Sequence, residues 1–135
     1  MKKIILSTLV VLSIALALTS CNNSQKAKTS DSDVLLVKFH ADWCGSCKAL
    51  SPLLTDLNGQ LKGKSAQYVE LDFTDEKTSV KARAKAKELG IADMLTEKQK
   101  TGYVAIIDNS SKKELGRLTK TQSVDEMYKQ VASHL

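Results

Sequence analysis

The stretch that decides the fold is Ala41–Lys48, ADWCGSCK, which places two thiols with two residues between them. The apolar run of residues 34–37 leads into it and predicts a buried strand that reaches His40. A helical pattern follows, with leucines at positions 50, 53, 54 and 57 and glycines as its end signals. A strand that presents Cys-x-x-Cys at the start of a helix indicates a dithiol redox site.

The composition is that of one globular domain. The 135 residues are 42% apolar and 26% charged, which is the balance of a soluble globule rather than a disordered tail. The net charge is +5, and no basic run is interleaved with aromatic residues as single-strand nucleic-acid binding requires. We therefore expect no nucleic-acid partner and interpret the charge as solubility, with contact to an anionic lipid surface as the lesser alternative.

Residues 1–20 predict a signal peptide. A short basic start is followed by the apolar residues 4–18, which are too few for a membrane span of roughly 20 residues. The next residues, Leu18-Thr19-Ser20-Cys21, resemble the end of bacterial lipoprotein signals, which implies that Cys21 is lipidated and becomes the new N-terminus. The alternative is an ordinary signal peptide with a chance cysteine, which would leave Cys21 as a free thiol.

The lipoprotein interpretation divides the three cysteines into one anchor and one redox pair. Residues 21–32, the lipidated Cys21 and the polar stretch behind it, then form a flexible tether. More than one acyl chain gives stable anchoring. We therefore expect a domain of residues 33–135 that is lipid-anchored in the bacterial cell envelope and faces the oxidising periplasm from the inner or the outer membrane.

The hydrophobic pattern predicts the order β-α-β-α-β-β-α, in which a helix joins two parallel strands before a hairpin and a covering helix. Ser123 and Glu126 fit a capping box at the start of the last helix. The expected strands are residues 34–40, 67–73, 103–108 and 114–119; the expected helices are residues 46 or 47 to 61, 76–89 and 123–135, with an irregular connection at 91–102 that includes a helical turn at 93–98.

The second helix depends on composition rather than on periodicity. Residues 81–87 alternate with period two, which is typical of a strand, but alanine and lysine favour helices and disfavour strands. We therefore predict a helix. Its expected apolar stripe consists of Val80, Ala82, Ala86 and Leu89.

The element order and the redox stretch resemble the thioredoxin superfamily. The matching residues are Phe39-x-Ala41-Asp42-Trp43-Cys44-Gly45-x-Cys47-Lys48, with Pro52 five residues after Cys47, where the family kinks its active-site helix. The resemblance covers about residues 33–135 and implies a three-layer α/β fold, with a central four-stranded mixed sheet flanked by helices. The N-terminal strand and helix of full thioredoxin are expected to be missing, because the tether is too short to hold both.

Three positions depart from the family pattern. The common Gly-Pro dipeptide between the cysteines is Gly45-Ser46 here, and the aligned position of the family's cis-proline is Gly102. Glycine can adopt the unusual backbone of that loop, and Tyr103 beside it is expected to form a wall of the substrate groove. Lys38 stands where many thioredoxins bury an acid. If buried, it would tune the thiols or donate a proton; the alternative is a lysine that extends outwards into solvent.

The two thiols are expected to have unequal roles. Cys44 lies at a helix N-terminus, where unpaired N–H groups favour an anion, so it is the candidate nucleophile. Cys47 lies one turn further in and is the candidate resolving thiol, and the pair forms the expected redox-active disulfide Cys44–Cys47. Trp43 resembles the family's rim tryptophan, which shields the pair, with plain packing as the alternative. Gly45, Ser46 and Pro52 complete the expected site.

A metal site is the main chemical rival, since two thiols can bind zinc or copper(I). A structural zinc site usually needs four ligands, however, and the only histidines are His40 and His134. We therefore expect neither a metal nor another cofactor.

The sequence thus predicts a thiol–disulfide oxidoreductase that reduces disulfides of client proteins and receives electrons from a membrane donor protein. The motif alone does not separate reduction from oxidation or isomerisation. The alternative function is a binding or chaperone-like lipoprotein of the same fold with little turnover, which the missing proline and Lys38 suggest.

Overall fold

The computed structural model describes residues 31–135. The predicted signal peptide, the predicted lipidation site Cys21 and nearly all of the predicted tether lie outside these residues. Within residues 31–135, no helix combines the length and the apolar character needed to cross a bilayer.

The sheet has four strands in the order β2-β1-β3-β4. They are β1 (Val34–His40), β2 (Ala66–Asp72), β3 (Tyr103–Asp108) and β4 (Glu114–Leu118). β1 pairs in parallel with β2 and antiparallel with β3, and β4 forms a hairpin with β3. The predicted mixed sheet is therefore confirmed, and β1 occupies the central position that its continuous apolar run requires.

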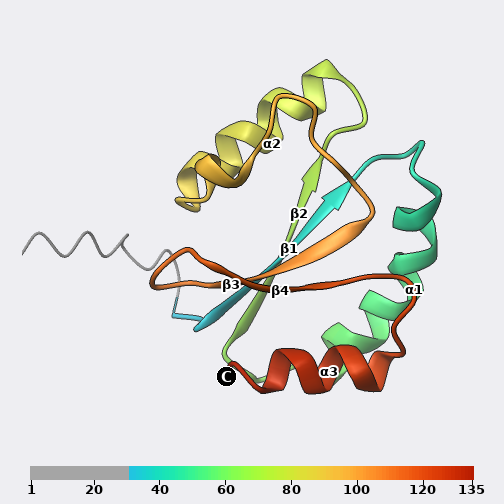
Figure 1. Cartoon of the computed structure of the whole chain (residues 1–135), viewed down its shortest axis with the longest axis vertical. Helices are drawn as coiled ribbons and strands as arrows, with labels where there is room; N and C mark the ends of the chain where they lie inside the picture. The colour runs from blue at the N-terminus through green and yellow to red at the C-terminus, as the bar shows by residue number, and fades with distance from the viewer. Residues whose placement is uncertain (1–30) are drawn as a thin grey trace, which may run out of the picture.

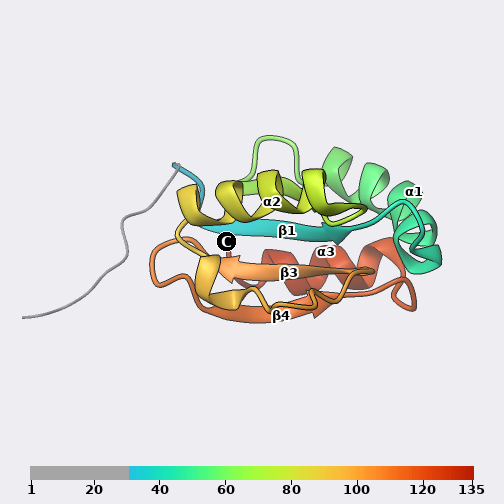
Figure 2. The same ribbon diagram turned by 90° about the horizontal axis from the view of Figure 1, so that it is seen from above.

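Helices cover both faces of the sheet, which gives the three layers expected (Figure 1). α1 (Gly45–Gln60) and α3 (Val124–Ala132) lie on one face, and α2 (Glu76–Glu88) lies on the other, as Figure 2 shows from above. The core under α1 and α3 is built from alternate residues of β1 and β3, such as Leu36 and Ile106, against Leu50 and Met127. Period-two alternation along the strands sends the intervening residues to the opposite face.

α2 packs its small residues on the second face of the sheet. Ala82, Ala86 and Leu89 are buried there against Phe39, as predicted. Val80 is 63% exposed, so its place in the predicted stripe is wrong. Helix positions that are two residues apart in sequence are separated by about 200° of rotation. Val80 therefore points away from the sheet when Ala82 points towards it.

The predicted element boundaries differ from the structure by a few residues. α1 begins at Gly45 because Cys44 itself is the N-cap residue. The helical turn η1 (Ala92–Met94) is shorter than the predicted turn, and α3 ends at Ala132 rather than at the last residue. The capping box of Ser123 and its partner three residues on is present.

Candidate functional site

Cys44 lies at the point where β1 gives way to α1. Its amide donates to the carbonyl oxygen of Ala41 at 3.0 Å, which closes a tight turn after the strand. As the N-cap residue it has extended backbone angles, and its Sγ accepts a hydrogen bond from the amide of Cys47 at 3.2 Å. The sulfur thus takes the place of a capping oxygen and faces the positive end of the helix. Cys44 is 8% exposed.

Cys47 lies one turn deeper and is completely buried. Its Sγ donates to the carbonyl oxygen of Phe39 at 3.6 Å. Both cysteines are free thiols, so the structure represents the reduced dithiol form. The two sulfurs therefore differ in depth and in the partner that each contacts.

These surroundings shift the pKa values of the two thiols in opposite directions. Burial disfavours the Cys44 thiolate, but hydrogen bonds from the side chains of Cys47 and Thr101 and from the amides of Cys47 and Ser46 outweigh it and lower the pKa of Cys44. Burial raises the pKa of Cys47, and the hydrogen bond with Cys44 adds to this rise. Cys44 is thus the thiol that ionises first.

The sequence analysis missed Thr101. Its side chain favours the ionised form of both thiols and so acts to lower the pKa of each. A threonine in an irregular connection carries no periodic signal, and only its position next to Gly102 could have indicated it.

Gly102, in the loop before β3, lies against Ser46 and the sulfur of Cys44. A Cβ atom on Gly102 would lie 2.8 Å from Cβ of Ser46 and 3.2 Å from Sγ of Cys44, and the backbone φ is +92°. The Gly102 amide also donates to the carbonyl oxygen of Phe39 at 2.9 Å. A proline has a fixed φ near −65° and no N–H, so it could not occupy this position in this backbone.

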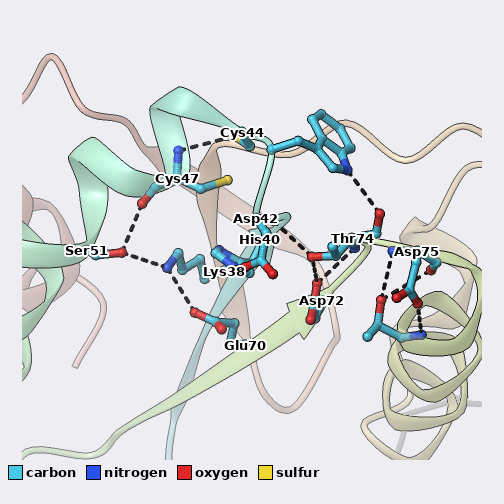
Figure 3. Close-up of polar contacts among 12 residues, drawn as sticks. Lys38, His40, Asp42, Cys44, Cys47, Ser51, Glu70, Asp72, Thr74 and Asp75 are labelled. Atoms are coloured by element: carbon cyan, nitrogen blue, oxygen red, sulfur yellow. Dashed lines mark hydrogen bonds and ion pairs between the residues drawn. The ribbon is translucent and has the colours of Figure 1, made fainter.

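Trp43 lies on the rim of the site and is 66% exposed. Its indole N–H donates to the carbonyl oxygen of Thr74 at 3.1 Å, and the Asp42 amide donates to the Thr74 hydroxyl at 2.9 Å (Figure 3). These bonds tie the redox stretch to the turn between β2 and α2. With this exposure, Trp43 lies outside the buried core.

Lys38 is buried beneath α1 and is only 3% exposed, so the alternative of a lysine that extends into solvent is wrong. Its Nζ forms an ion pair with Oε2 of Glu70 at 2.9 Å and donates to Oγ of Ser51 at 3.2 Å. The Ser51 hydroxyl in turn donates to the carbonyl oxygen of Cys47 at 3.0 Å (Figure 3). Lys38 therefore connects to the backbone of Cys47 through one hydroxyl.

The remaining predicted residues border the site. Pro52 lies inside α1, where its missing N–H removes one helical hydrogen bond. Tyr103 is half-buried and stacks on Phe39 with ring centroids 4.8 Å apart. In the part of the chain that the structure describes, no group of three or more His, Cys, Asp or Glu side chains is placed to hold a metal ion.

Comparisons with known proteins agree with this geometry. A family model described as Thioredoxin matches residues 15–89. A protein disulfide-isomerase of Arthroderma benhamiae is 43% identical over 44 residues, which are 33% of this chain and 8% of that protein. A thioredoxin of Staphylococcus haemolyticus is 38% identical over 68 residues, which are 50% of this chain and 64% of that protein. The chain thus spans less than two thirds of these curated relatives.

Solved structures share the fold at low sequence identity. A thiol:disulfide interchange protein of the thioredoxin family from Chlorobium tepidum has a TM-score of 0.53 at 16% identity, covering 77% of this chain and 81% of that one. A protein named Trxlp from Edwardsiella tarda has a TM-score of 0.51 at 18% identity, covering 77% of this chain and 86% of that one. These similarities support the fold alone.

The contact between Gly102 and Ser46 predicts a coupled effect on stability. Gly102→Ala should lower the free energy of unfolding by about 1–3 kcal/mol, because the new Cβ overlaps Ser46 and the positive φ is strained. Adding Ser46→Gly should recover part of this loss, because it removes the atom nearest to the new Cβ. Urea denaturation of the parent, the two single variants and the double variant would measure this recovery. Gly45→Ala is the control, because a Cβ there meets nothing within 4 Å. Purely additive effects of the two substitutions would contradict the steric account.

The hydrogen bonds of Thr101 predict a pH effect. Thr101→Val keeps the shape of the side chain but removes the hydroxyl that stabilises the Cys44 thiolate, so the pKa of Cys44 should rise. The pH dependence of alkylation by iodoacetamide measures this: its midpoint should lie below the roughly 8.5 of a free cysteine in the parent and move to higher pH in the variant. Thr55→Val, on the exposed side of α1, should leave the midpoint unchanged. An unmoved midpoint in Thr101→Val would refute the assigned role.

Proposed function

The chain belongs to the thioredoxin family, whose model matches more than half of it, and on that premise we propose that it is a thiol–disulfide oxidoreductase that reduces disulfides of client proteins. The observation that carries this proposal is the position of the Cys44 sulfur at the N-cap of α1. There the sulfur accepts a hydrogen bond from the amide of Cys47, and the pKa of the Cys44 thiol is lowered. A thiolate at neutral pH is the form that attacks disulfides.

The proposed reaction has two exchange steps. The Cys44 thiolate attacks one sulfur of the client disulfide, which breaks the client S–S bond, forms a mixed disulfide and releases one client thiolate. Cys47 then loses its proton and attacks the Cys44 sulfur, which releases the second client thiolate and forms the Cys44–Cys47 disulfide. Two electrons pass from the protein to the client, and the client thiolates take up two protons.

The depth of the two thiols supports this division of roles. Cys44 keeps a small exposed surface, so a client sulfur can approach it, whereas Cys47 has none. The raised pKa of Cys47 keeps it protonated until the mixed disulfide has formed. Because α1 places Cys47 one turn from Cys44, the second attack needs no large movement of the backbone.

A reductase needs a supply of electrons after each cycle. We propose a membrane donor protein for this role and a lipid-anchored location in the cell envelope, facing the periplasm. The support is the sequence Leu18-Thr19-Ser20-Cys21 behind a basic and apolar leader. In an oxidising compartment, a reducing thiol pair depends on such a donor.

The catalytic assignment predicts distinct defects for the two cysteines. Cys44→Ser should abolish reduction of insulin disulfides, a loss of at least about 1,000-fold, because the attacking sulfur is gone. Cys47→Ala should accumulate mixed disulfides with client proteins, because the second step cannot occur. Non-reducing gels and identification of the trapped proteins measure this, and Lys62→Ala, beyond the far end of α1, should behave as the parent.

Two results would change the assignment. Undiminished insulin reduction by Cys44→Ser would show that Cys44 is not the nucleophile. Absence of trapped proteins in Cys47→Ala, together with thiols that do not react at neutral pH, would favour a binding protein of the same fold with little turnover.

The location has its own test in a Gram-negative host. The whole chain should incorporate labelled palmitate and sediment with membranes, and Cys21→Ala should lose the label and appear in the soluble fraction. Ser24→Ala is the matched control in the predicted tether. Labelling that survives Cys21→Ala would show that the anchor is not at this residue.

A further inference from the structure

A groove of about 260 Å³ lies on the face of the sheet that α2 also occupies. The connection between α2 and β3 forms one side of it, and Tyr103 of β3 with Arg117 of β4 forms the floor. Figure 2 shows this connection passing along β3 and β4 before it enters β3. Tyr103 directly follows Gly102, the residue that faces Cys44. The Cα atoms of these two neighbours are about 3.8 Å apart, so one lining residue of the groove is adjacent to the site.

The groove is basic. Its lining includes Lys98, Lys100 and Arg117 and no acidic side chain. Arg117 is paired with Glu114, at 2.5 Å between Nε and Oε1, and lies over the Tyr103 ring at 4.5 Å. Within residues 31–135, no carboxylate forms an ion pair with either lysine. Two ammonium groups thus border the groove without an oppositely charged partner among the residues that the structure describes.

Hydrogen bonds hold the groove in shape before anything binds. Oε1 of Gln99 accepts a hydrogen bond from the amide of Thr96 at 3.1 Å, and Nε2 of Gln99 donates one to the Tyr103 hydroxyl at 3.4 Å. From α2, the guanidinium of Arg83 donates to the carbonyl oxygens of Thr96 and Glu97, each at 3.0 Å. A side that is already fixed loses little conformational entropy on binding.

We propose that this groove binds an acidic segment of the client protein, next to the disulfide that Cys44 attacks. The substrate class is then a disulfide with carboxylates a few residues from the attacked cysteine. The inference rests on the proposed function, because it deepens the specificity of the same site. A concave site with an aromatic floor fits a peptide segment better than the flat surface of an anionic membrane.

The test uses three disulfide peptides that differ only in the three residues on each side of the cysteine: all Glu, all Ser or all Lys. The rate of reduction by the whole chain is measured at low salt and at about 0.5 M salt. At low salt the Glu peptide should react about 10-fold faster than the Lys peptide, and the difference should largely vanish at high salt. Equal rates for the Glu and Lys peptides at low salt would overturn the proposal.

Paired charge reversals locate the effect. Lys98→Glu with Lys100→Glu should reverse the order of the Glu and Lys peptides and leave the Ser peptide unchanged. The control is Lys62→Glu with Lys64→Glu, which changes the net charge by the same amount. These two residues follow the C-terminus of α1, a helix of 16 residues, and therefore lie about 24 Å from its N-terminus. This control should keep the original order. The same change of order in both double variants would show a net-charge effect without a docking site.

A binding measurement separates this inference from the redox proposal. Fluorescence anisotropy of a labelled Glu peptide without cysteine, added to a Cys44→Ser, Cys47→Ser protein, should show binding that the Lys98 and Lys100 reversal removes. Failure to reduce even the Ser peptide would refute the redox function, whereas reduction without charge preference or binding would refute only the groove. If the reversal weakens binding to anionic vesicles but not to the peptide, the groove contacts lipid and the inference is wrong.

Discussion

The site depends on one atom, the carbonyl oxygen of Phe39. It accepts hydrogen bonds from the Cys47 thiol and from the Gly102 amide, and so joins the end of β1, the first turn of α1 and the loop before β3. Phe39 is opposite Leu71 on β2 and opposite Tyr103 on β3. A slip of β1 by one residue would turn this carbonyl and every neighbouring side chain to the wrong side. The register of the central strand therefore fixes the chemistry.

Two departures from the family pattern prove to be one structural change. Ser46 replaces the usual proline between the cysteines, Gly102 stands at the aligned position of the cis-proline, and the two residues lie against each other beside the Cys44 sulfur. The small side chain of Ser46 packs against Gly102, which has no side chain. The Cys44 sulfur thus has a wall of bare backbone at Gly102, and the side chains that lower the pKa of its thiol are those of Cys47 and Thr101. At this wall the Cys44 sulfur therefore meets main chain rather than a proline ring.

The sequence predicted the fold well because apolar periodicity and the Cys-x-x-Cys stretch both depend on local order. The bounds of β1 and the capping box at Ser123 follow from neighbouring residues alone. Val80 was misplaced because period-two and helical patterns overlap in an Ala- and Lys-rich segment. Thr101, the ion pair of Lys38 and the basic groove were out of reach, because each depends on which strands and loops meet in space. Lys38 is opposite Glu70 only once β1 and β2 have a register.

That ion pair has a consequence for how the sequence can drift through evolution. Glu70 is on an edge strand with its side chain 41% exposed, so by exposure alone it belongs to the positions that change freely. Its loss would leave the Lys38 ammonium buried without its counter-ion, which is destabilising, whereas loss of both charges together is close to neutral. Descendants of this protein are thus expected to change positions 38 and 70 together, and an alignment that treated position 70 as neutral would miss this covariation.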